Sequence, residues 1–158
     1  MNPEIKSANL YYHGEGWAEH MATECDKAAK SIHISALSLL PPGPNSTGSW
    51  PDLWRSWCAS ARRGVRVDFW LPATNPIYPA TSGNRKAGST IQLNGMYIHY
   101  ITGNRLLHAK TCVIDEQQIW IGSGNFTAAA AHHNYEAYLC ADCPEIAKQI
   151  VARWKNLA

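Results

Sequence analysis

The apolar residues of this chain change their spacing repeatedly, from a helical repeat to the denser pattern of a strand. Trp17, Met21 and Cys25 lie at helical spacing, and the β-rich run 31–40 (SIHISALSLL) follows them. A second helical stripe starts near Ser49, a candidate N-cap, and stops at Gly64 before the run 65–71 (VRVDFWL). Helix followed by strand therefore occurs twice, which predicts an α/β fold.

The rest of the chain continues this order. Further strands are expected at 96–102, 106–115, 117–122 and 135–140, with a short alanine-rich helix at 126–132 and a closing helix at 144–157. The segments 41–51 and 72–95 are rich in Pro, Gly, Asn, Ser and Thr and are interpreted as loops, the longer one functional. With 158 residues, 46% of them hydrophobic, we expect one domain, 1–158, built on a mixed β-sheet flanked by helices on both faces.

Several classes of protein are excluded or disfavoured. No stretch approaches the ~18 apolar residues of a membrane span, so no integral membrane association is expected. The first dozen residues lack the pattern of a secretory signal, and the five cysteines are odd in number and dispersed. We therefore expect a cytoplasmic protein, or a periplasmic or secreted one if a leader precedes this chain. Cys140 and Cys143 form a C-x2-C without a second ligand pair, so buried thiols are expected and no metal or cofactor.

Basic residues are concentrated in the middle of the chain. The net charge of the whole chain is only +2, yet residues 53–110 contain eight Lys and Arg side chains against one Asp. A small total can conceal a strong local field. The asymmetry indicates a positive face for an anionic partner, although a solvated helix and loop coated with arginines would give the same count.

Reactive side chains are grouped at fixed intervals near residue 110. His108, Lys110 and Asp115 form H-x-K-x4-D, and Gly122-Ser123-Gly124-Asn125 follows six residues later. The whole pattern, H-x-K-x4-D-x6-G-S-x-N, resembles the signature of the phospholipase D superfamily. The chain order around it, including the acidic residue Glu136 on the next strand, resembles the small single-motif bacterial endonucleases of that superfamily.

The residue types suit a phosphate. Along a strand, His108 and Lys110 share one face, which places a nucleophile beside a cation. Ser123 and Asn125 offer neutral donors just ahead of a short helix, whose free N–H groups favour anions. Gly122 and Gly124 allow a close backbone approach to substrate. A phosphodiester needs charge neutralisation, a nucleophile and an acid for the leaving oxygen, and this segment offers the first two.

The resemblance implies further roles. It implies metal-independent phosphodiester cleavage through a phosphohistidine on His108, with a second histidine as general acid. One chain carries one motif, so it also implies a homodimer with the active site on the twofold axis. Glu136 would orient His108 by accepting its second ring N–H. Asp115 falls on the opposite strand face by alternation, so a supporting, structural role at the strand end is expected for it.

The substrate follows less directly from the motif. A short chain with one motif favours nucleases, and the basic middle region agrees, since Lys and Arg supply most nonspecific affinity for nucleic acid. Tyr78, Arg85 and Lys86 on the long loop are expected to guide a DNA or RNA strand, with the tyrosine stacking on a base. Two alternatives stay open: a phospholipase D-type lipid hydrolase or phosphatidyl transferase, and a catalytically silent nucleic-acid-binding member of the fold.

Overall fold

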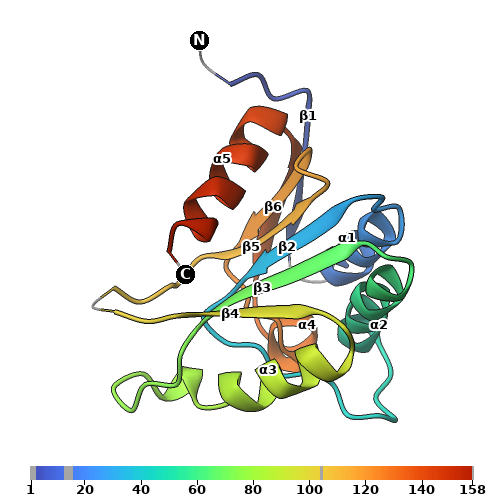
Figure 1. Cartoon of the computed structure of the whole chain (residues 1–158). Coiled ribbons are helices and arrows are strands. Elements are labelled where there is room, and N and C mark those ends of the chain that lie inside the picture. The colour runs from blue at the N-terminus through green and yellow to red at the C-terminus, as the bar shows by residue number, and fades with distance from the viewer. Residues whose placement is uncertain (1–2, 13–15, 104, 158) are drawn as a thin grey trace.

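The computed structural model describes residues 3–12, 16–103 and 105–157, which build a seven-stranded mixed sheet with helices on both faces (Figure 1). The strands are β1 (Ser7–Tyr12), β2 (Ser31–Ser35), β3 (Arg66–Pro72), β4 (Tyr97–Ile101), β5 (Lys110–Ile114), β6 (Gln118–Gly122) and β7 (Ala137–Asp142). The helices are α1 (Trp17–Asp26), α2 (Ser49–Arg62), α3 (Asn84–Leu93), α4 (Ala128–His132) and α5 (Pro144–Lys155), with a 3-10 turn, η1, at Pro79–Thr81. None of the described helices is long and apolar enough to cross a membrane.

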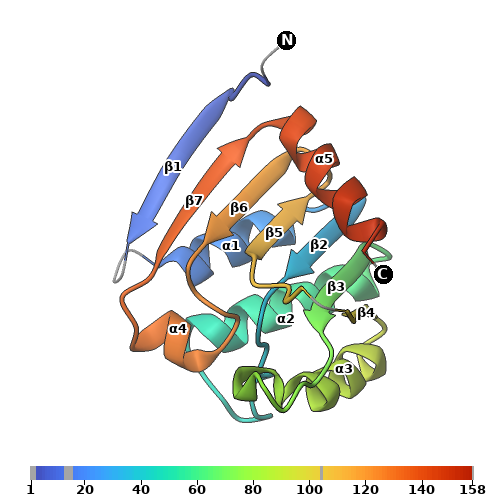
Figure 2. The ribbon, with the colours of Figure 1, turned by 90° about the vertical axis from the view of Figure 1, so that its left-hand side faces the viewer.

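The strand order is β1-β7-β6-β5-β2-β3-β4. β2, β3 and β4 run parallel, whereas β5 runs antiparallel to both β2 and β6, and the antiparallel pattern continues through β7 to β1. As a result, the ends of β2, β3, β4 and β6 and the beginnings of β5 and β7 lie at one edge of the sheet. We call it the site edge; α3 and α4 lie beside it, in the lower part of Figure 2.

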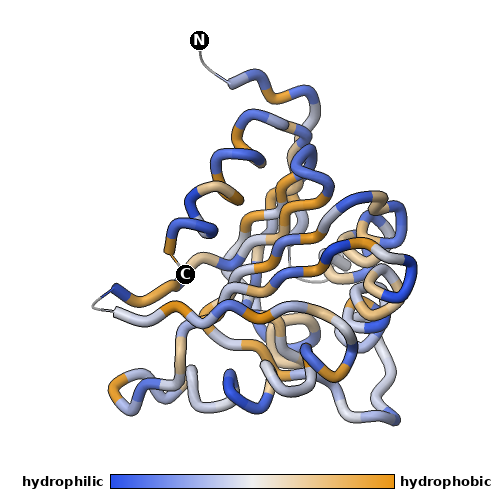
Figure 3. Tube along the Cα trace, viewed as in Figure 1, coloured by the Kyte–Doolittle hydropathy of each residue, from blue (hydrophilic) through white to orange (hydrophobic). Residues whose placement is uncertain are grey.

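The helices cover the two faces unequally. α1 and α2 lie on one face, and α5 lies on the other (Figures 1 and 2). Hydrophobic and hydrophilic residues alternate along α5 (Figure 3), as expected of a helix with one side on a sheet. The predicted fold class, a mixed sheet flanked by helices on both faces, is confirmed.

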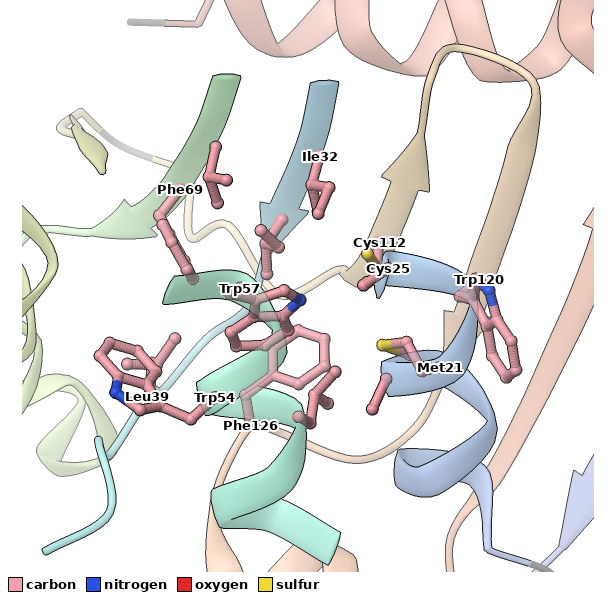
Figure 4. Close-up of a cluster of buried hydrophobic side chains, with 14 of the residues drawn as sticks. Met21, Cys25, Ile32, Leu39, Trp54, Trp57, Phe69, Cys112, Trp120 and Phe126 are labelled. Carbon is pink, nitrogen blue, oxygen red and sulfur yellow. The ribbon is translucent and has the colours of Figure 1, made fainter. Parts of the chain in front are cut away.

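The larger core lies between the sheet and the helices α1 and α2. Trp57 stands at its centre, in edge contact with Phe69 and Phe126 (Figure 4). Two serines of α2 join the helices within this core: Ser56 Oγ donates to Ala22 O and Ser60 Oγ donates to Cys25 O. The tryptophan stripe of α2 is therefore part of the core. Burying one such large apolar side chain stabilises the fold by roughly 1.5–3 kcal/mol.

Three local predictions were wrong. Residues 7–12 form an edge strand, β1, where the sequence pattern indicated none. Ser49 is the first residue of α2 instead of its cap, because Gly48, with φ of 104°, occupies the N-cap position. The expected loop 72–95 contains the ten-residue helix α3.

Helix α3 is concealed in the sequence by its unusual buried stripe. Asn84, Ala87, Gly88 and Ile91 are buried at helical spacing, but only two of them are typical core residues. Tyr100 of β4 packs on the helix at Gly88, where a Cβ would lie 1.9 Å from the tyrosine hydroxyl. Arg85 and Lys86 are therefore helical residues, and their expected place on a loop was wrong.

The α5 side of the sheet buries a charged cluster. Asp68 on β3, only 1% exposed, accepts two hydrogen bonds from Arg66 (2.7 and 3.0 Å) and lies 2.7 Å from His99 Nε2. Burial would raise the pKa of Asp68, but these partners outweigh it and lower the pKa. His33 on β2 is 2% exposed, and its Nδ1 lies 3.7 Å from the same carboxylate. Burial lowers the pKa of His33 despite the nearby carboxylate.

We expect His33 to make the fold sensitive to mild acid. The unfolded chain takes up a proton on this histidine near pH 6.5, whereas the folded protein does so only at lower pH. The stabilising contribution is therefore complete above about pH 6.5 and is lost as the pH falls below it. Urea unfolding at pH 7 and pH 5 should show a smaller loss of stability for His33→Gln than for the wild type. The exposed His133→Gln is the control, and equal losses in all three proteins would contradict this assignment.

Asp115 fastens the far end of β5, away from the site edge. Its carboxylate accepts hydrogen bonds from the backbone N–H groups of Ala29 (2.9 Å), Lys30 (2.7 Å) and Ser31 (2.9 Å). Burial would raise the pKa of Asp115, but the three donors lower it. The residue has φ of 54° in the turn before β6. These contacts support the structural role expected for Asp115. The length of β5 separates Asp115 from His108.

Asp115→Asn is expected to destabilise the protein without impairing catalysis. Asparagine tolerates the positive φ, so the change isolates the lost charge-assisted hydrogen bonds, about 1.5–3 kcal/mol at pH 7. The difference should shrink below about pH 4, where the unfolded aspartate is protonated. Urea unfolding measures the loss, with Glu116→Gln in the same turn as the control. Reduced activity of fully folded Asp115→Asn would instead place Asp115 in the catalytic machinery.

Candidate active site

The imidazole of His108 and the ammonium of Lys110 meet at the beginning of β5. The strand begins at Lys110, later than predicted, so His108 lies two residues before it and is exposed. Lys110 Nζ lies 2.9 Å from His108 Nδ1 and 3.2 Å from Nε2. The two distances are nearly equal, so Nζ lies against the ring as a whole. The geometry thus places the amine of Lys110 in contact with the imidazole of His108.

Lys110 is almost completely buried, with 6% of its surface exposed. Burial lowers the pKa of Lys110, and the field of Glu136 partly opposes this shift. In the described part of the chain, no carboxylate lies within ion-pair distance of its ammonium group. A charge in such a place interacts strongly with an incoming anion, because little water screens it.

Asn125 follows β6 and faces the end of β2. Its Oδ1 accepts a hydrogen bond from the backbone N–H of Ser38 (3.2 Å). Leu40 N–H donates to Phe126 O (3.1 Å), which holds the two segments together. With the carbonyl side of the amide thus occupied, the Nδ2 group is the donor that Asn125 can offer to a ligand.

Ser123 and Glu136 form a hydrogen-bonded pair beside this site. Ser123 Oγ donates to Glu136 Oε2 and accepts from the backbone N–H of Ala137 (3.1 Å). Asn134 Nδ2 donates to the other carboxylate oxygen of Glu136 (3.1 Å). The hydrogen bonds of the described residues do not include one between Glu136 and His108. The orienting role expected of Glu136 therefore stays a prediction.

The two glycines of the motif have a packing reason. Gly122 is the last residue of β6, and a Cβ there would lie 2.5 Å from Ala137 O and 2.5 Å from the ring of Tyr138. At Gly124 a Cβ would lie 3.1 Å from Cγ of Glu136. Substrate contact by either glycine stays a prediction. The five-residue helix α4 begins with Thr127 as its N-cap, whose hydroxyl accepts from Ala130 N–H (3.2 Å).

Asn84 at the start of α3 was not predicted to contribute to the site. It is fully buried, and its Nδ2 donates to Leu37 O and Pro72 O, both at 2.9 Å. Its Oδ1 accepts from Leu39 N–H (3.3 Å). These three bonds fasten α3 to the ends of β2 and β3, next to the segment that holds Asn125. In the sequence, this role could have been indicated by a polar residue, Asn84, at helical spacing from Ala87 and Ile91.

The structure separates the residues expected to guide substrate. Arg85 and Lys86 lie on α3, and Lys86 lines an apolar groove formed with residues 40–44. Tyr78 lies in the β3–η1 connection and lines a different cleft, which Arg105 also lines. Within the described chain, no group of three or more His, Cys, Asp or Glu side chains is placed to hold a metal ion. All five cysteines are buried free thiols, as expected for Cys140 and Cys143.

Known proteins resemble this chain both in amino-acid sequence and in fold. The family model described as cardiolipin synthase, PLD-like domain, matches residues 21–158. Two curated relatives named phospholipase D, from Rickettsia conorii and Rickettsia felis, are 26% and 25% identical over 141 residues, 89% of this chain. The matched region spans 64% of the length of each of these relatives.

Solved structures extend the comparison of the fold. Nuc from Salmonella typhimurium, a phospholipase D family member, has a TM-score of 0.77 at 24% identity, covering 98% of this chain and 94% of Nuc. NucT from Helicobacter pylori has a TM-score of 0.74 at 17% identity, covering 98% and 96%. Because the family model matches most of the residues, including the H-x-K and G-S-x-N segments, this chain belongs to the phospholipase D superfamily.

Proposed function

We propose that this chain is a phosphodiesterase that hydrolyses nucleic acid through a phosphohistidine intermediate. One observation carries the proposal: the buried Lys110 ammonium touches the exposed His108 imidazole at the site edge. A phosphodiester carries a negative charge that repels nucleophiles. A desolvated cation neutralises this charge, the imidazole beside it supplies the nucleophile, and Asn125 adds a neutral donor. Because these side chains supply the charge neutralisation, the proposed reaction is independent of metal ions.

The proposed reaction has two displacements. A ring nitrogen of His108 attacks phosphorus, and the bond from phosphorus to the leaving oxygen breaks as that oxygen takes a proton from an acid. A water molecule then gives a proton to the same group, now acting as a base, and attacks phosphorus. The phosphorus–nitrogen bond breaks, which restores His108 and releases a phosphomonoester.

The acid in this scheme is a second histidine. The resemblance to the single-motif members of the superfamily implies that this histidine comes from a second copy of the chain. We therefore assign the acid to the partner subunit's His108 in a homodimer with one active site on its twofold axis. The two imidazoles, identical in the free protein, take different protonation states when substrate is bound.

An exposed apolar strip on the α5 side of the sheet supports this dimer. Leu10, Leu139 and Ile121 are aligned across β1, β7 and β6, and they are 50%, 39% and 40% exposed. α5 covers other residues on this side of the sheet and leaves the strip bare. Tyr12, two residues after Leu10, lines a pocket with Ser123 and Glu136. A second copy seated on the strip would therefore adjoin the site edge.

The names of the similar proteins point to two substrate classes, nucleic acid and phospholipid. The solved relatives Nuc and NucT match nearly the whole of this chain and nearly their own whole length, which fits a small one-domain member of the superfamily. The Rickettsia relatives named phospholipase D favour a phospholipid as the second candidate. Among the cations of residues 53–110, Arg55 and Arg66 are paired with Asp52 and Asp68. Arg85 and Lys86 on α3, Arg105 and Lys110 are the cations near the site edge, and they favour nucleic acid because phosphate contacts dominate its nonspecific binding.

The proposed chemistry predicts cleavage that persists in EDTA. Purified protein should cut DNA or RNA under chelation, and His108→Ala should lower the rate by roughly a factor of a thousand or more, because it removes the nucleophile. An acid-labile phosphoenzyme should form with the wild type and be absent from the variant. Gel assays of single-stranded DNA, duplex DNA and RNA, run beside phosphatidylcholine vesicles, measure the substrate class.

His133→Ala, which changes an exposed histidine at the end of α4, is the matched control and should keep full activity. Loss of cleavage on chelation would contradict the metal-free reaction. Head-group release from the vesicles with nucleic acids untouched would favour the lipid enzyme. Binding without cleavage of any substrate would favour the silent member of the fold.

The dimeric site predicts how activity depends on subunit composition. Equal amounts of wild type and His108→Ala are mixed, unfolded and refolded together, so that the two kinds of subunit combine at random. If each site needs two histidines, activity should be about one quarter of that of the same total amount of wild type. If each subunit acts alone, about one half should remain.

A second variant links this result to the apolar strip. Leu139→Glu places a charge in the strip and should lower both the dimer population and the activity, since a buried unpaired charge opposes association. Sedimentation measures the first and the nuclease assay the second. A fully active monomer would exclude the twofold site.

A further inference from the structure

A cleft at the site edge is lined in part by the segment of chain that leads into His108. One wall is the β3–η1 connection, residues 72–78, and the other is formed by residues 101–103, 105 and 106 of the β4–β5 connection. The cleft has a volume of about 560 Å³. The second wall continues directly into His108, three residues beyond Arg105. Both connections extend to the same side of the sheet in Figure 1.

The lining combines one aromatic ring, one cation and small polar groups with apolar side chains such as Ile77, Ile101 and Leu106. Tyr78 is 42% exposed, so part of its surface is available to a ligand. Arg105 is exposed, and in the described part of the chain no carboxylate lies within ion-pair distance of its guanidinium. Thr74, Asn75 and Thr102 add hydrogen-bonding groups. A ring that can stack and a cation that can pair with phosphate are the two elements of a nucleotide site.

The wall that carries Tyr78 is held in a fixed shape. Thr81 is fully buried, and its hydroxyl donates to Tyr78 O (2.8 Å) and accepts from Asn75 N–H (2.8 Å). Asn75 Oδ1 accepts from Ile77 N–H (2.9 Å), and Tyr78 N–H donates to Asn75 O (2.9 Å). A loop organised before binding loses little conformational entropy when a ligand arrives.

We propose that this cleft binds one unpaired nucleotide next to the scissile phosphate, with its base on Tyr78 and its phosphate on Arg105. Three residues span at most about 11 Å, so Arg105 is within reach of a phosphate adjoining the one at His108. A base inside a duplex is already stacked on both faces and cannot also stack on the tyrosine. The inference rests on the proposed function and deepens it, because it makes single-stranded nucleic acid the preferred substrate.

The test compares one oligonucleotide as a single strand and in a duplex. The wild type should have a higher kcat/KM on the single strand. Tyr78→Leu should raise KM for the single strand about tenfold with little change in kcat, whereas Tyr78→Phe keeps the ring and should behave as the wild type. Arg105→Gln should raise KM and reduce the slope of log KM against log salt by about 0.7, the loss of one phosphate contact. Arg153→Gln on α5 is the charge-matched control and should change neither.

Binding gives a second readout that does not need turnover. His108→Ala with a fluorescent single strand should show the same weakening when Tyr78→Leu or Arg105→Gln is added. Cleavage with equal rates on single strand and duplex, or with KM and salt slope unchanged in both variants, would overturn this inference alone. No cleavage of any nucleic acid would overturn the proposed function and this inference with it.

Discussion

The antiparallel pairing of β5 with both β2 and β6 is the constraint on which the rest of the structure depends. β2, β3 and β4 are parallel and end at one edge, and the reversal at β5 brings the beginning of that strand to the same edge. β5 therefore begins, at Lys110, beside the ends of β2 and β6. Without this reversal, His108 and Asn125 would lie at opposite ends of the sheet.

The same pairing explains how a lysine can be buried beside an exposed histidine. Lys110 is the first residue of a strand whose following four residues are all buried. Its ammonium reaches the edge of this layer, where it meets the ring of His108. Burial weakens the screening of its charge, and a bound phosphate would offset the cost of that burial. The burial that destabilises the ammonium of Lys110 therefore also strengthens its attraction for an anion.

Structural and functional demands are separated along β5. The end of the strand near Asp115 is secured by three hydrogen bonds, which the backbone N–H groups of residues 29–31 at the start of β2 donate to the Asp115 carboxylate. The opposite end carries the reactive pair, with an exposed imidazole. The α5 side of the sheet is likewise divided between a covered half and the apolar strip. This division leaves the reactive end and the strip open to a substrate and a second subunit.

The sequence predicted much of this arrangement and missed identifiable parts. Strong helical stripes, such as that of α2 with its tryptophans, were recognised because burial there uses large apolar residues. α3 was missed because its stripe uses Asn84 and Gly88, which are chosen for contacts with distant residues. β1 was missed because an edge strand that is largely exposed needs no apolar pattern. Asp115 was expected on the opposite strand face from His108, but the two residues lie beyond opposite ends of β5, so the length of the strand and not alternation separates them.

The sequence by itself determined the reactive group and the order of helices and strands. His108 and Lys110 are two positions apart, so the local geometry of the chain is enough to bring them together. The tertiary structure alone decided which distant residues complete the site, namely Ser38 against Asn125, Asn84 against the ends of β2 and β3, and Arg105 across from Tyr78. Those contacts depend on strand order and register, which arise from packing of the whole sheet and leave no periodic mark in the local sequence.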